Sequence, residues 1–98
     1  MNNEYNYDIL FYAFRYALGR KTYAVNDVTG EIIKQLKNIP DKDLFNMHKE
    51  IHNYLNDEKV TDIIAEDINK EWDYTNNRII EELVTRGKIE ISIIVNDK

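Results

Sequence analysis

The chain has 98 residues, no cysteine, and 13 basic against 18 acidic side chains, which gives a formal net charge of −5. This length suits a single domain, and a hydrophobic fraction of 43% is too high for a disordered segment. The negative charge argues against a general DNA or RNA binder, which needs a basic face to neutralise phosphates. The lack of cysteine excludes disulfides, thiol nucleophiles and cysteine-ligated metal centres.

The sequence also bears on where the protein acts. No apolar run approaches the ~18 residues that a membrane-spanning helix requires. Residues 1–4 contain no basic segment of the kind that begins a secretory signal peptide. We therefore expect a cytoplasmic protein, without membrane contact.

Two helices are predicted in the N-terminal part of the chain. Apolar residues at spacings of three and four predict a helix over 8–18, with Asp8 as its N-cap and Gly19 closing its end. A second helix is expected over 23–38, where Gly30 costs about 1 kcal/mol relative to alanine unless something packs closely on it. The apolar stripe of the first helix consists of Ile9, Leu10, Ala13, Phe14, Ala17 and Leu18.

A third and a fourth helical segment follow. Pro40 is tolerated in a first helical turn, and Asp41 and Asp43 suit the positive end of a helix dipole, so a helix is expected from there to Asn56. Helical periodicity continues over 58–86. The polar stretch 73–77 predicts a break or kink, so this segment forms one helix or two.

The C-terminal segment has the periodicity of a strand. Apolar and polar residues alternate over 88–95, and such a strand should not leave its backbone edges unpaired in water. We expect it to pair within the chain, with a partner, or with a second copy, and favour a homodimer through 88–95. The fold class predicted from these elements is mainly α: one domain over 1–98, a compact bundle of four or five helices with one C-terminal β-strand.

His48 and His52 lie four residues apart on one helix face and are the first candidates for a chemical site. The zinc-protease pattern places glutamate directly after the first histidine, to activate a metal-bound water. Lys49 holds that position here, Glu50 is one residue late, and the chain has no third histidine. A metal-dependent enzyme built on this pair is therefore only a third hypothesis, and we expect no metal, no cofactor and no catalytic residue.

The aromatic side chains gather at the N-terminus, where seven of the eleven fall in the first 23 residues. The simplest interpretation is that they line the edge of a small core with their hydroxyls outward. Tyrosines beside arginines are also typical of protein-binding hot spots, and such rings can stack on a base while basic groups meet the phosphates. The candidate ligand-binding residues on this interpretation are Tyr12, Arg15, Tyr16, Arg20 and Lys21.

Acidic side chains concentrate in residues 57–73, which hold seven of them against two lysines and so account for the whole net charge. One interpretation is a solvated helix face that serves solubility. The other is a negative surface that attracts a basic partner. The candidate partner-binding residues are Asp62, Glu66, Asp67, Glu71 and Asp73.

Residues 8–25 read DILFYAFRYALGRKTYAV and resemble a group of small phage and prophage proteins that share an FRYALGR-x-TYAV stretch. In that group a hydrophobic helix follows, and later a tryptophan in an acidic helix, to which Trp72 corresponds. The resemblance implies a genomic context and carries over no catalytic residue. Small acidic phage proteins also include anti-CRISPR and other anti-defence inhibitors, which occupy a surface of a host effector; this is an analogy of class.

These observations give a leading hypothesis and an alternative from another class. We expect a non-catalytic inhibitor of a host defence effector, acting in the host cytoplasm through its acidic face on a protein with a basic surface. Direct contact with nucleic acid is not expected. The alternative is a regulatory module that binds a nucleotide or nucleic acid through the N-terminal aromatic and arginine cluster.

Overall fold

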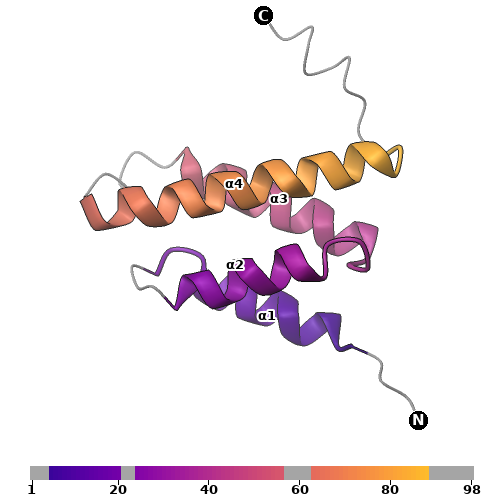
Figure 1. Ribbon diagram of the computed structural model, residues 1–98, viewed down its shortest axis with the longest axis horizontal. Helices are drawn as coiled ribbons and strands as arrows, with labels where there is room; N and C mark the ends of the chain where they lie inside the picture. The colour runs from indigo at the N-terminus through magenta and orange to yellow at the C-terminus, as the bar shows by residue number, and fades with distance from the viewer. Residues whose placement is uncertain (1–4, 21–23, 57–62, 89–98) are drawn as a thin grey trace, which may run out of the picture.

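The structure is a computed structural model in which four helices occupy the described part of the chain (Figure 1). The described residues are 5–20, 24–56 and 63–88. The helices are α1 (Tyr7–Ala17), α2 (Val25–Lys34), α3 (Asp41–Leu55) and α4 (Ile63–Thr85). This confirms a mainly α bundle. No strand occurs in the described ranges, and the strand expected over 88–95 falls, apart from Lys88, outside them, so the homodimer through it stays a prediction.

α1 begins and ends close to the predicted positions but uses a different cap. The side chain of Asn6 accepts a hydrogen bond from the backbone N–H of Ile9 at 3.1 Å, so Asn6, and not Asp8, is the N-cap. After the last helical residue the chain reverses at Gly19, whose φ of +93° lies in the left-handed region that favours glycine. The predicted helix end at Gly19 is thus confirmed to within one residue.

α2 is shorter than the predicted helix over 23–38. The backbone N–H groups of Asn38 and Ile39 both donate to the carbonyl of Gln35, so the chain tightens into turns after Lys34. These turns direct Leu36 and Ile39 into the interior, where they are 5% and 1% exposed. The helix therefore ends at Lys34 because burial of these two side chains is more favourable than continuation of the helix.

α4 runs through residues 73–77 without interruption, so the predicted break there is wrong. None of these five residues is glycine or proline, and two of their polar side chains are buried with partners. The Thr75 hydroxyl donates to the backbone carbonyl of Glu71 at 2.8 Å. The side chain of Asn76 hydrogen-bonds His48 on α3. The polar stretch thus faces partly inward, and its side chains satisfy their hydrogen bonds there.

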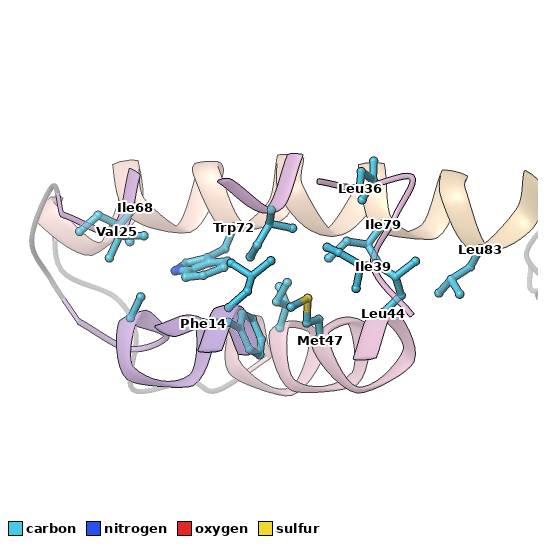
Figure 2. Close-up of a cluster of buried hydrophobic side chains, with 14 residues drawn as sticks. Phe14, Val25, Leu36, Ile39, Leu44, Met47, Ile68, Trp72, Ile79 and Leu83 are labelled. Carbon is cyan, nitrogen blue, oxygen red and sulfur yellow. The ribbon is translucent and has the colours of Figure 1, made fainter. Parts of the chain in front are cut away.

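The core lies where the four helices meet, and Trp72 of α4 is its largest side chain. The Trp72 ring meets Phe14 of α1 edge-on, with centroids 5.6 Å apart and planes at 81°. Figure 2 shows Trp72, Ile79 and Leu83 pointing into the same interior as Phe14. α3 and α2 pack against α4, and α1 packs against α2 and α3. The fully or almost fully buried apolar residues are Leu10, Phe14, Ala17, Val25, Ile32, Leu36, Ile39, Leu44, Met47, Ile51, Ile68, Trp72, Ile79 and Leu83.

Gly30 stands in the interior of α2 and is exposed. Beyond its chain neighbours and the surrounding helix backbone, no atom of the described residues lies within 4 Å of the position that a Cβ atom would take. No close packing explains this glycine, so Gly30→Ala is expected to stabilise the fold by about 1 kcal/mol through helix propensity. Thermal unfolding followed by circular dichroism should show the midpoint rise by about 4–8 °C. Gly19→Ala is the matched control, because its positive φ should make the same substitution lower the midpoint. A lower midpoint for Gly30→Ala would contradict the account.

Candidate partner-binding surfaces

Three of the five predicted partner-binding carboxylates are exposed on the N-terminal half of α4. Glu66, Asp67 and Asp73 are exposed, and no ion pair joins them to another described residue. Glu71 is half-buried and accepts a hydrogen bond from the Thr29 hydroxyl at 3.0 Å, which ties α4 to α2. Asp62 lies outside the described residues. We call Glu66, Asp67 and Asp73 the acidic surface of α4.

The acidic side chains do not form one row along the helix. At about 100° per residue, Glu66 and Asp73, seven positions apart, share a side, whereas Asp67 is turned by about 100° from Glu66. Lys70 is exposed on the arc between Glu66 and Asp67. The carboxylates therefore wrap around the solvent side of α4, and a partner would have to cover this side broadly instead of gripping a single edge.

The N-terminal aromatic cluster is divided between the core and solvent. Tyr12 and Tyr16 are 71% and 69% exposed, which is more than the rim of a core requires. Ile9 was expected in the apolar stripe with Phe14, but it is 63% exposed. Ile9 and Phe14 are separated by about 140° around the helix axis, so they face different sides. Ile9, Tyr12 and Tyr16, at spacings of three and four, form a second stripe beside that of Phe14. We call Ile9, Tyr12 and Tyr16 the outer face of α1. The spacing of these three residues in the sequence could have indicated this face.

The two arginines predicted to accompany these tyrosines, Arg15 and Arg20, point to different places: Arg15 contacts α3, and Arg20 contacts Tyr16. Arg15 forms an ion pair with Glu50 of α3, with Nη2 to Oε2 at 2.7 Å, and the hydrogen bonds that it donates to Glu50 raise the pKa of Arg15. Arg20 lies over the ring of Tyr16 at 4.3 Å and donates from Nε to the Tyr16 carbonyl. Lys21 lies outside the described residues. The four predicted ligand-binding residues that the structure describes, Tyr12, Arg15, Tyr16 and Arg20, therefore do not converge on one point.

A small apolar hollow of about 250 Å³ lies at the C-terminal end of the outer face of α1. The Tyr16 ring and the Arg20 side chain border it, and the start of α2 closes its other side. A hollow of this size and composition suits one apolar side chain of a partner. The residues that line it are Tyr16, Ala17, Arg20, Ala24, Val25 and Val28.

The opposite end of α1 is acidic. Asp8 and Asp43 line a shallow polar hollow together with Tyr5, Tyr7 and Pro40. Burial, and then the neighbouring Asp8 carboxylate, raise the pKa of Asp43. Within the described residues, neither of these two carboxylates has a basic partner in an ion pair. This end of α1 therefore offers negative charge, and Arg20 offers positive charge at the opposite end, where Glu50 balances Arg15.

The two histidines face a cleft between α3 and α4. His48 Nδ1–H donates to Asn76 Oδ1 at 3.0 Å, and Asn56 Nδ2–H donates to His52 Nε2 at 3.1 Å. Their ring centroids are 6.1 Å apart, and Asp73 lines the same hollow of about 420 Å³. Among the described residues, no three histidine, aspartate or glutamate side chains are grouped as a metal site. The sequence could not indicate Asn76 as the partner of His48, because 28 residues separate them.

No helix in the described ranges combines the length and apolar character needed to cross a membrane. Comparison with known proteins adds no relationship to this picture. No family model, no curated protein and no solved structure matches the chain.

Proposed function

We propose that this protein is a non-catalytic inhibitor that binds a basic surface of a host defence effector through the acidic surface of α4. The observation that carries the proposal is the set of three exposed carboxylates, Glu66, Asp67 and Asp73, which have no ion-pair partner within the described residues. The anti-defence role itself comes from the class analogy with small acidic phage proteins.

The charge of α4 gives the proposal its physical content. Residues 66–73, in the N-terminal half of α4, carry four carboxylates and one lysine, so the field at this half of the helix is negative. A groove that binds nucleic acid must be basic, because it neutralises phosphates. An acidic surface is attracted to such a groove from a distance, and this attraction raises the association rate at low salt. Added salt screens the charges and lowers the association rate.

The nucleotide-binding alternative receives less support from the geometry. A phosphate near Tyr12 would find Nε and Nη2 of Arg15 already donating to Glu50, so only Nη1 of an already paired guanidinium remains for it. A base that stacked on Tyr16 would compete with the guanidinium of Arg20, which already covers one face of that ring. We therefore do not advance a second function.

The proposal predicts that a charge reversal on α4 abolishes inhibition. Purified RNA-guided nucleases from a panel of bacterial types would be assayed for cleavage of target DNA with and without the full chain. We expect inhibition of at least one type, and we expect Glu66→Lys combined with Asp67→Lys to raise the dissociation constant at least about 100-fold, as a reversal of two charges at a complementary surface should.

The matched control is Asp27→Lys combined with Glu81→Lys. It changes the net charge equally and, like the test pair, alters one carboxylate in a first helical turn and one exposed carboxylate further along a helix. The control should still inhibit. An equal loss in both variants would mean that only total charge matters, and failure to bind any nuclease of the panel would count against the proposal.

A further inference from the structure

The outer face of α1 is an apolar surface on the side of the helix that faces away from the core. Phe14 on the inner side is fully buried, whereas Ile9, Tyr12 and Tyr16 are 63–71% exposed. A helix that is apolar on both sides is normally covered on both sides, and grouped exposed apolar side chains mark interaction sites. The hollow beside Tyr16 adds a receptor for an apolar side chain at one end of this face.

We propose that a second copy of this chain covers the outer face of α1, with the two α1 helices antiparallel. The charges at the ends of the helix determine this choice. Asp8 stands exposed at the N-terminal end beside Asp43, and at the C-terminal end Arg20 stands exposed near Arg15, which is paired with Glu50. Antiparallel copies bring each acidic end against a basic end, whereas parallel copies would oppose like charges. The helix dipoles favour the same arrangement.

The spacing of the side chains fixes the register of the pair. With a two-fold axis at Tyr12, the Tyr12 rings of both copies meet, and Ile9 of each copy lies against Tyr16 of the other and close to its apolar hollow. In the same register Asp8 reaches Arg15 of the second copy. Arg15 uses Nε and Nη2 on Glu50, which leaves the two N–H donors of Nη1 for this carboxylate.

The area of the surface indicates how strong the pair is. At roughly 200 Å² for a large side chain, the exposed fractions of Ile9, Tyr12 and Tyr16 amount to roughly 400 Å² on each copy. Two copies then bury roughly 800 Å² through these residues, and the flanking Asp8 and Arg20 bring the total to the lower end of specific interfaces, about 1,000 Å². We therefore expect a reversible dimer with a dissociation constant in the micromolar range.

Sedimentation equilibrium of the full chain over roughly 1–300 µM tests the dimer directly. The mass should rise from the 11.7 kDa of one chain to twice that value. Tyr12→Glu places two carboxylates at the axis and should raise the dissociation constant at least 10-fold. The matched control is Tyr74→Glu, which alters an exposed tyrosine of α4, 52% exposed, and should leave the constant unchanged. Circular dichroism checks that both variants fold, and Tyr12→Ser serves if the glutamate is not tolerated.

Engineered cysteines test the orientation, since the chain has none of its own. Ile9→Cys combined with Tyr16→Cys should form disulfide-linked dimers under mild oxidation, because position 9 of one copy opposes position 16 of the other. Ile9→Cys alone should stay uncross-linked, because the two positions 9 are then farther apart than the ~7 Å limit between Cα atoms. Cross-linking of the single variant would overturn the antiparallel arrangement.

Two further results would overturn the proposal itself. One is a monomeric mass over the whole concentration range, which would leave the outer face of α1 to a different protein. The other is a dimer that Tyr12→Glu does not weaken, which would assign self-association to another surface, such as the segment 88–95. No effector protein enters these measurements, so their outcome is independent of the proposed inhibitory function.

Discussion

Trp72→Ala is expected to leave the protein largely unfolded at 37 °C. Trp72 is fully buried, and its ring joins α4 to Phe14 of α1. Removal of a buried tryptophan costs about 3–5 kcal/mol, because apolar burial is lost and a cavity remains. That loss is comparable to the whole stability of a small domain, which starts at about 5 kcal/mol.

The measurement is chemical unfolding followed by far-ultraviolet circular dichroism. Tyr74→Ala is the control: it removes an aromatic ring two positions further along α4, at a site that is 52% exposed, and should cost less than about 1 kcal/mol. Trp72→Phe should fall between them, at about 1–2 kcal/mol, since the indole Nε1 has no hydrogen-bond partner to lose among the described residues and only volume is removed. A wild-type midpoint for Trp72→Ala would contradict the packing described.

Arg86→Ala is expected to cost about 2–4 kcal/mol, the second largest effect. The Arg86 side chain is 18% exposed and lies just after α4. It donates from Nη1 to the Ile39 carbonyl at 2.7 Å and from Nη2 to the Leu36 carbonyl at 3.0 Å. It also pairs with Asp41 and Glu82 at 2.7 and 2.9 Å. Its loss leaves two backbone carbonyls of the α2–α3 connection and the half-buried Glu82 without the donor that they have in the wild type.

The control and the pH dependence both distinguish this network from a surface ion pair. Arg78→Ala removes a more exposed arginine whose nearest carboxylate, Glu81, is 3.6 Å away, and should cost less than about 0.5 kcal/mol. The hydrogen bond from Arg86 holds the pKa of Asp41 below its usual value of 3.8. The stability from Asp41 is therefore present above that value and is lost as the pH falls through its lowered pKa. The difference between wild type and Arg86→Ala should shrink on acidification; a constant difference would contradict the assignment.

The sequence predicts the elements of this fold better than their limits. Pro40 and the acidic first turn placed α3 correctly, because these residues act locally. The limit of α2 and the continuity of α4 depend on tertiary contacts. Leu36 and Ile39 leave the helix to reach the core, and Asn76 finds its partner His48 on another helix. Neither contact can be read from neighbouring residues.

The candidate surfaces likewise combine features that the local sequence predicts with features that depend on contacts between helices. Exposure of Glu66, Asp67 and Asp73 follows from charge, which the sequence displays. The engagement of Glu71 by Thr29 and of Arg15 by Glu50 depends on how α2 and α3 approach. The first contact removes Glu71 from the acidic surface of α4, and the second occupies Nε and Nη2 of Arg15, which leaves only Nη1 for another carboxylate. Ile9 is the opposite case, since its exposure follows from the angle between two apolar stripes on one short helix.

The central position of Trp72 makes it an internal optical probe. It is the only tryptophan of the chain, and it is shielded from water by side chains of other helices. Its fluorescence should therefore be emitted at short wavelength from the folded chain and shift to the red when the core opens. The outer face of α1 and the acidic surface of α4 both lie on the solvent side of their helices, so a molecule that binds there should leave this emission unchanged. The same fluorescence can thus follow unfolding, without a label, in the presence of a partner that contains no tryptophan.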